Sequence, residues 1–136
     1  AHRGAGRLDF ADLHLERGYG TFRAYSRSKL ANILFSQELS RRVRGVSSNA
    51  FHPGAVGSRF ATNNGWLGKT AMAALRPFFL TPARGADTGV WLASSPEVEG
   101  LTGGYWHKRH QRQPAHADPD DAARLWEVSA QLTGVY

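Results

Sequence analysis

Residues 25–35 read YSRSKLANILF, and this stretch places a tyrosine and a lysine, Tyr25 and Lys29, four positions apart. Four residues make slightly more than one turn of an α-helix, so both side chains project from the same face. A neighbouring ammonium favours phenolate, and we expect Lys29 to lower the pKa of Tyr25 from about 10 towards neutrality. Such a phenol exchanges a proton with an alcohol or carbonyl oxygen near physiological pH. Taken alone, the same spacing also fits an ordinary pair of surface neighbours.

The residues around the pair predict a long helix that begins near Thr21, as the N-cap, and ends at Arg44, with Gly45 as the stop signal. One narrow stripe of this helix carries the polar side chains of Tyr25, Lys29, Asn32 and Ser36. An adjoining face is apolar and consists of Leu30, Ile33 and Leu34. A helix that is apolar nearly all round is covered on more than one side. We therefore expect the polar stripe near the N-terminal end of the helix to face a cleft.

The composition suits one globular domain, or part of a larger one, because the chain has 136 residues, of which 41% are hydrophobic and 15 are glycines. The lack of cysteine excludes disulfides, thiolate metal sites and cysteine nucleophiles. No run approaches the roughly 20 apolar residues of a membrane span, and no basic-then-apolar leader is present. We therefore expect a cytoplasmic protein without a membrane span. The chain opens with Ala1 and not with methionine, which is compatible with a longer parent.

A net charge of +6 and a pI near 10.3 raise the alternative of a nucleic-acid-binding protein. One basic cluster, Arg41, Arg42 and Arg44, falls at the end of the predicted helix, where cations favour the helix dipole without a partner. A second basic stretch, residues 107–112, has no aromatic ladder and no DNA-binding pattern. The histidines His107, His110 and His116 lack a fourth ligand at zinc spacing. We expect them in a solvated loop, with no metal and no nucleic acid bound.

The remaining sequence predicts the order helix–strand–helix–helix–strand–helix. The expected elements after the first helix are a strand over 46–52, a helical stretch over 66–79, a helix capped by Thr81 and ending near 94–96, a strand over 103–106 and a helix from Asp118 to Gly134. Two strands joined by a helical crossover lie parallel in one sheet. Two strands alone do not form such a sheet. We expect an α/β fold, namely the C-terminal part of a doubly wound Rossmann-type parallel sheet. Residues 1–136 would form an incomplete single domain that lacks its N-terminal βαβ half.

Several motifs in order resemble those of a known family. They are YSRSKLANILF at 25–35, NAFHPGAV at 49–56, Thr81-Pro82 before Gly85-Ala86, and LTGGY at 101–105. Over essentially its whole length, the chain resembles the C-terminal half of a short-chain dehydrogenase/reductase, most closely the retinol-dehydrogenase-like branch. The resemblance implies an oxidoreductase that transfers a hydride between NAD or NADP and an alcohol or ketone.

The resemblance also implies roles for individual residues. Tyr25 would be the catalytic acid/base, and Lys29 would lower its pKa and bind the ribose hydroxyls of the cofactor. The residues expected to border the nicotinamide are Pro53, Gly54, Val56 and Ser58. Residues 59–80 would form a substrate lid for a small hydrophobic alcohol or carbonyl compound, with Phe60, Trp66, Leu67, Phe78 and Phe79. Ordinary packing is an equally good explanation of these aromatic and apolar side chains.

In relatives, the long catalytic helix commonly pairs with its symmetry mate, so a homodimer through residues 21–44 is expected. The Leu30, Ile33 and Leu34 face would be free for that contact. The alternative is that this face is buried against other parts of the same protein.

The sequence departs from the family pattern in several places. The third catalytic residue, a serine, would precede Ala1, and the catalytic asparagine is also missing, since Asn32 is not its equivalent. The segments Gly4-Ala-Gly6 and Gly18-Tyr-Gly20 lack the third glycine and the preceding strand of a pyrophosphate-binding turn. We expect these residues alone to bind cofactor poorly and to turn over negligibly. Two alternatives stay open: a non-enzymatic binding or scaffold module, and a nucleic-acid binder with salt-dependent affinity.

Overall fold

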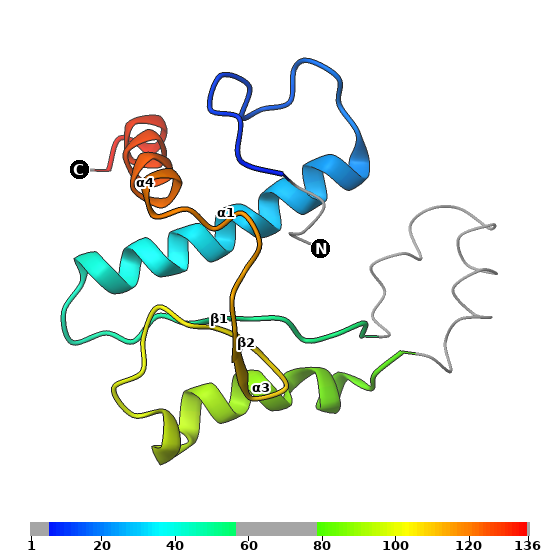
Figure 1. Ribbon diagram of the computed structural model, residues 1–136, viewed down its shortest axis with the longest axis vertical. Coiled ribbons are helices and arrows are strands. Elements are labelled where there is room, and N and C mark those ends of the chain that lie inside the picture. The colour runs from blue at the N-terminus through cyan, green and yellow to red at the C-terminus, as the bar shows by residue number, and fades with distance from the viewer. Residues whose placement is uncertain (1–5, 57–78, 136) are drawn as a thin grey trace. The chain divides into compact units, whose positions relative to one another are not determined.

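The computed structural model describes residues 6–56 and 79–135 (Figure 1). The chain divides into two compact units. Within the described residues, unit 1 comprises 6–50, 100–105 and 111–135, and unit 2 comprises 51–56, 79–99 and 106–110. The elements are α1 (Thr21–Arg42), β1 (Ala50–Phe51), α3 (Pro82–Ser94), the 3₁₀ helix η4 (Pro96–Val98), β2 (Tyr105–His107), β3 (His110–Arg112) and α4 (Pro119–Thr133).

The first helix, α1, is slightly shorter than the sequence predicted. Gly20 has the extended backbone of an N-cap, with φ −147°, and provides no side-chain cap. Thr21 is therefore the first helical residue and not the cap. At the other end, Val43 adopts an extended conformation and its N–H donates to the Leu39 carbonyl at 3.0 Å. The predicted end at Arg44 was wrong because the backbone leaves the helical region at the β-branched Val43.

The core of unit 1 lies where α1 meets α4 and the segment before α1. Buried apolar side chains form this core, namely Leu8, Leu30, Leu34 and Ala122. Leu30 and Leu34 have no exposed surface, and Ile33 retains 5%. The Leu30, Ile33 and Leu34 face is thus covered within this chain, as the alternative interpretation of the sequence held, and the homodimer through residues 21–44 stays a prediction. Burial of each of the leucine and isoleucine side chains on this face stabilises the folded state by roughly 1.5–3 kcal/mol.

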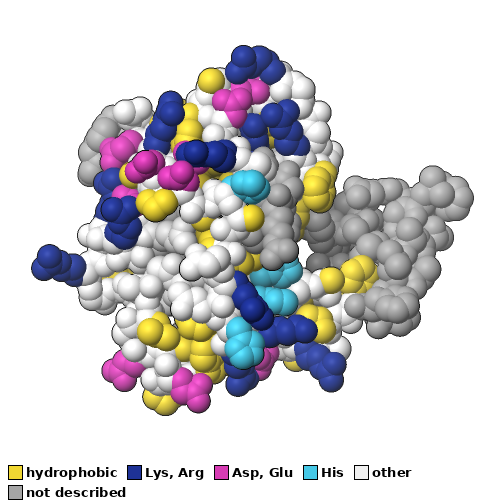
Figure 2. Space-filling view, in the orientation of Figure 1, with side chains coloured by type: hydrophobic (Ala, Val, Ile, Leu, Met, Phe, Trp, Pro, Cys, Tyr) yellow, Lys and Arg dark blue, Asp and Glu magenta, His cyan; other side chains and the backbone are white. Residues whose placement is uncertain are grey.

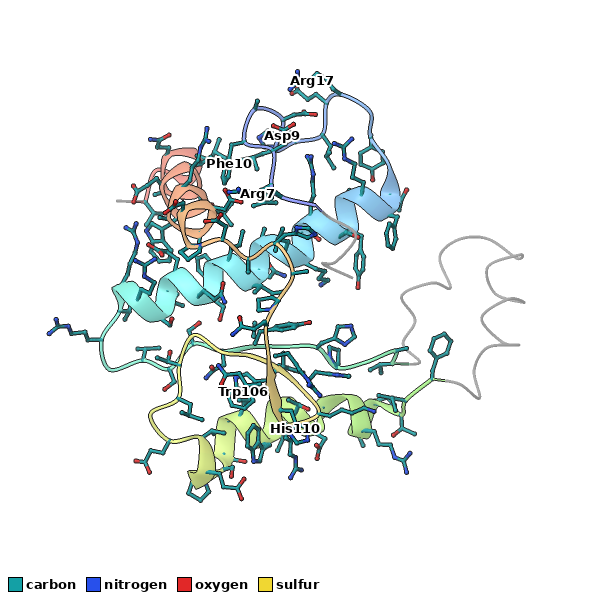
Figure 3. The ribbon with its side chains drawn as sticks, in the orientation of Figure 1. Arg7, Asp9, Phe10, Arg17, Trp106 and His110 are labelled. Carbon is teal, nitrogen blue, oxygen red and sulfur yellow. The ribbon has the colours of Figure 1, made fainter. Side chains whose placement is uncertain are left out.

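Polar contacts hold the segment before α1 against α4 within unit 1. The guanidinium of Arg7 donates to both carboxylate oxygens of Asp121, at 3.1 and 3.0 Å, and lies 2.9 Å from Asp118. Figure 3 shows Arg7 and Phe10 on this segment, close to α4. The Arg124 guanidinium lies 4.5 Å from the centre of the Phe10 ring. These contacts hold the described part of this Gly- and Arg-rich segment, which forms no helix or strand, against α4.

The strands form one small sheet in the order β1–β2–β3. The Ala50 N–H donates to the Gly104 carbonyl at 2.9 Å, and the His52 N–H donates to the Trp106 carbonyl at 2.8 Å. From the first hydrogen bond to the second, the donor and the acceptor both move two residues towards the C-terminus. Strands β1 and β2 are therefore parallel, and α3 lies in the connection between them. The predicted parallel crossover is confirmed. Strand β1 is far shorter than the 46–52 run, however.

Strand β3 was not predicted. It pairs with β2 through a two-residue turn at Lys108 and Arg109, which have φ of 51° and 61°. Such tight hairpin turns need positive φ at both positions, and Gly or Asn is their usual sequence signal. This chain has neither residue there. The expectation of a solvated loop was therefore wrong for His107 and His110, which lie on β2 and β3.

The caps of the two later helices match the prediction. The Thr81 hydroxyl accepts a hydrogen bond from the Arg84 N–H at 3.3 Å, with Pro82 in the first turn of α3. Asp118 caps α4 by accepting from Asp120 N–H at 2.9 Å, and Gly134 ends α4 with φ 69°. The predicted helical stretch over 66–79 lies outside the described residues except for Phe79. None of the described helices is long and apolar enough to cross a membrane.

Candidate active site

Tyr25 and Lys29 are neighbours on α1, as the sequence predicted. The Lys29 Nζ atom lies 5.4 Å from the centre of the Tyr25 ring. Tyr25 is half-buried and Lys29 is exposed. The Ser28 hydroxyl donates to the Tyr25 carbonyl at 2.8 Å, so the Ser28 side chain is bonded to its own turn of the helix. The arrangement places a positive charge beside a phenol that solvent can reach.

The helix under this pair is held firmly within unit 1. Ser26 is fully buried and Arg27 retains 8% exposure. One Arg27 N–H group donates to the Asp12 carbonyl at 3.2 Å, and this contact ties the segment before α1 to the helix. Sequence reasoning gave Arg27 no role, because nothing local marks a basic side chain that will be buried.

The polar stripe of α1 does not share one environment. Asn32 is exposed, whereas Ser36 is buried and its hydroxyl lies 2.9 Å from the Ser48 hydroxyl. In unit 1, a pocket of about 220 Å³ opens beside α1, with Arg27 and Ser28 among its lining residues, and Tyr25 and Lys29 do not line it. The expected cleft beside Tyr25 and Lys29 therefore stays a prediction.

The second group of predicted residues, Pro53, Gly54 and Val56, follows the carboxyl end of β1 in unit 2. Gly54 has φ 85°, a left-handed conformation that favours glycine. A Cβ atom there would lie 2.7 Å from Leu80 Cδ1. The Gly54 N–H donates to His52 Nδ1 at 2.7 Å. Gly54 is thus required both by its backbone conformation and by the close approach of Leu80.

Val56 is held against the start of α3. It forms a parallel bridge with Leu80, and the Leu80 N–H donates to the Ala55 carbonyl at 2.8 Å. The Val56 side chain lies directly over Gly85, where an added Cβ would fall well inside van der Waals contact. The glycine at position 85 thus permits a close approach between this turn and α3, which local patterns did not reveal.

His52 is the polar side chain that sequence reasoning missed in this turn. Burial lowers the pKa of His52 below its usual value, and the neighbouring His107 lowers it further. The two imidazole rings meet edge to face with centres 5.4 Å apart. Because His52 Nδ1 accepts from Gly54, the proton of the neutral ring resides on Nε2. A histidine two positions before a glycine could have suggested this turn, as Asx turns do.

The predicted residues do not all fall in one described group. Tyr25 and Lys29 belong to unit 1, and Pro53, Gly54 and Val56 belong to unit 2. The predicted residues Ser58, Phe60, Trp66, Leu67 and Phe78 lie outside the described residues. Phe79 is described and half-buried. Among residues 6–56 and 79–135, no group of three or more histidine, aspartate or glutamate side chains is arranged to hold a metal ion.

Comparison with known proteins finds clear relatives, although no family model matches the chain. It is 42% identical to human retinol dehydrogenase 14 over 96% of this chain and 41% of that protein. It is 38% identical to human retinol dehydrogenase 13 over 96% of this chain and 43% of the relative. It is 41% identical to the human WW domain-containing oxidoreductase over 93% of this chain and 32% of the relative. The chain thus spans less than half the length of each of these relatives.

Proposed function

We propose that this chain, which belongs to the short-chain dehydrogenase/reductase family in its retinol-dehydrogenase-like branch, carries the proton-transfer residues of an NAD(P)-dependent oxidoreductase. The substrate would be a small hydrophobic alcohol or its carbonyl counterpart. The observation that carries the proposal is the Tyr25 and Lys29 pair on α1, with Lys29 Nζ 5.4 Å from the Tyr25 ring centre. The named relatives are oxidoreductases, which supports the reaction class.

Tyr25 acts in this proposal as the general acid/base. In the oxidation direction, its phenol oxygen takes the proton from the substrate hydroxyl, and in reduction its O–H protonates the carbonyl oxygen. The Lys29 ammonium stabilises negative charge as it develops on the phenol oxygen. Buried anchors on the same helix, Ser26, Leu30 and Leu34, hold the pair in place, which limits the entropy lost on positioning.

The proposal also includes roles in cofactor binding. Lys29 would donate to the ribose hydroxyls, while Pro53, Gly54, Val56 and Ser58 would border the nicotinamide. The described turn fits this role, because Pro53–Val56 follow the carboxyl end of the parallel strand β1, where ligands of open α/β sheets bind. Bound NAD or NADP supplies or accepts the hydride. Phe60, Trp66 and Leu67 would contact the substrate.

The parallel β1–α3–β2 crossover supports a Rossmann-type fold for the whole domain. Residues 1–136 would be the C-terminal, substrate-side portion of that single domain. The glycine-rich pyrophosphate turn and the catalytic serine and asparagine would come from residues beyond this sequence. We accordingly expect the 136 residues alone to be inactive.

Replacement of Tyr25 by phenylalanine in the full-length protein tests the proposal. We expect Tyr25→Phe to lower kcat by about 100-fold or more, because general acid/base catalysis typically contributes that much. Turnover is followed through NAD(P)H absorbance with apolar alcohols and ketones. Cofactor affinity, measured by NAD(P)H fluorescence, should change little, since the proposed cofactor contact belongs to Lys29.

Tyr19 offers a matched control, because it lies before the same helix, is 69% exposed and has no proposed role. Tyr19→Phe should leave kcat unchanged. Lys29→Met should lower kcat and also weaken NAD(P)H binding. Undiminished turnover by Tyr25→Phe would show that the acid/base assignment is wrong.

A further inference from the structure

A pocket of about 530 Å³ lies within unit 2, between the His52 turn, the first half of α3 and the β2–β3 hairpin. We refer to it as the basic pocket. Its polar lining includes Arg84, Lys108, His52 and His107, and its apolar lining includes Pro53 and Leu80. Figure 2 shows histidine side chains beside lysine and arginine side chains on one face. The pocket is far larger than a bare inorganic ion and is within the size range of small-molecule sites.

The charges of the basic pocket do not balance. Asp87 is an acidic residue of the lining, and both of its carboxylate oxygens accept from the Arg109 guanidinium, one of them at 2.9 Å. The hydrogen bond from Arg109 holds the pKa of Asp87 below its usual range, so this carboxylate stays charged and paired. No ion pair of Arg84 or Lys108 with any other described residue is found. Two cations therefore line the pocket without an acidic partner among residues 6–56 and 79–135.

The remaining polar groups of the basic pocket also favour an acceptor ligand. His52 Nδ1 is already occupied by the Gly54 N–H at 2.7 Å, so only its Nε2–H is left, and that group donates. The first turn of α3 lies in the wall, and a helix N-terminus adds partial positive charge. Lys108 sits at the first position of a tight turn with φ 51°, which fixes where its side chain starts.

We propose that the basic pocket binds a small amphipathic carboxylate. Its carboxylate accepts charge-assisted hydrogen bonds from Arg84 and Lys108, and its hydrocarbon body packs against Leu80 and Pro53. A bare phosphate or acetate leaves most of the volume and the apolar wall unused. A neutral alcohol leaves the two cations unpaired. This site goes beyond the proposed hydride transfer, because it requires no turnover and no cofactor.

Binding of octanoate to the full-length protein tests the site, with 1-octanol and inorganic phosphate as probes that each lack one of the two features. Chemical-shift changes are followed by NMR at residues of α3 and the hairpin. We expect octanoate to bind more tightly than either comparison probe, and added salt to weaken it. Arg84→Gln and Lys108→Gln should each weaken octanoate binding about tenfold, the effect of one lost charge-assisted hydrogen bond.

Arg44→Gln is the matched control, since Arg44 is exposed, belongs to unit 1 and contributes the same charge to the whole protein. It should leave octanoate binding unchanged. Equal affinity for 1-octanol and octanoate, equal affinity for phosphate, or an equal loss in Arg44→Gln would each overturn the proposal. The same holds if shift changes fall outside the pocket.

The carboxylate that binds in the basic pocket could belong to the substrate or to a separate ligand. Inhibition kinetics with octanoate distinguish these two sources. Octanoate that competes with the alcohol substrate would show that the acidic group belongs to the substrate. Octanoate that binds without competing would show a separate ligand. Both results keep the site. Because the primary measurement is binding, an inactive protein would overturn the proposed function and leave this inference standing.

Discussion

Acidification should release the turn at Gly54 by protonating one nitrogen of His52. In the folded protein, His52 Nδ1 accepts the Gly54 N–H at 2.7 Å. A protonated imidazole carries hydrogen on both nitrogens and can no longer accept. The Gly54 N–H is then left in a half-buried site without this acceptor. The same turn holds Pro53 and Val56, the residues proposed to border the nicotinamide.

The direction of the pH effect follows from the surroundings of His52. Burial is the largest cause that lowers the pKa of His52 below its usual value of 6.5, and the neighbouring His107 also lowers it. The charged groups of the surrounding pocket are Arg84, Lys108 and the pair of Arg109 with Asp87. The unfolded chain therefore takes up the proton before the folded chain does as pH falls. The stability contributed by neutral His52 is complete above pH 6.5 and is lost as pH falls through the folded-state pKa.

The size of the effect follows from one neutral hydrogen bond, which contributes about 1 kcal/mol net. In His52→Ala, the Gly54 amide should open and exchange its hydrogen about fivefold faster, since 1 kcal/mol corresponds to roughly that factor. His52→Asn should restore much of the protection, because an asparagine oxygen accepts from the N–H two residues on. It should also abolish the pH dependence, since an amide does not titrate.

The assay is amide hydrogen exchange by NMR at Gly54, combined with titration of the imidazole carbon protons. His110→Ala is the control, because His110 is an exposed histidine on β3 and does not accept from the Gly54 N–H. Equal Gly54 exchange in wild type and His52→Ala would refute the reasoning. So would a His52 titration midpoint above 6.5.

Three further predictions concern stability, measured as the free energy of unfolding in urea. Gly85→Ala should destabilise the protein by about 1–3 kcal/mol, because the new Cβ overlaps the stiff Val56 side chain. This loss should appear even though alanine normally favours a helix over glycine by up to about 1 kcal/mol. A stabilised variant would show that this close approach is absent. Leu34→Ala should cost about 2–5 kcal/mol, since the side chain has no exposed surface, and a loss below 1 kcal/mol would contradict its burial. Asp118→Ala should lower the free energy of unfolding by about 1 kcal/mol, because it removes the α4 cap. Gly20→Asp should raise it by about a few tenths of a kcal/mol, because it adds a side-chain cap to α1. If both variants changed the stability in the same direction, the cap assignments would be refuted.

Local signals in the sequence predicted the elements whose ends depend on nearby residues. Thr81 and Asp118 cap the helices that they were expected to cap, because the cap bond spans only two or three residues. The Gly134 stop holds for the same reason. Strand β3 was missed because its turn at Lys108 and Arg109 uses residues that rarely adopt positive φ. Only pairing with the rest of the sheet compensates for that strain.

The sequence by itself determined the Tyr25 and Lys29 pair, because helix geometry places residues four apart on one face whatever surrounds them. Only the tertiary structure decided that the Leu30 and Leu34 face is covered by α4 and the segment before α1, and that His52 holds the Gly54 turn against Leu80. Burial and close approach depend on segments distant along the chain, and no local pattern specifies which distant segment will supply the contact.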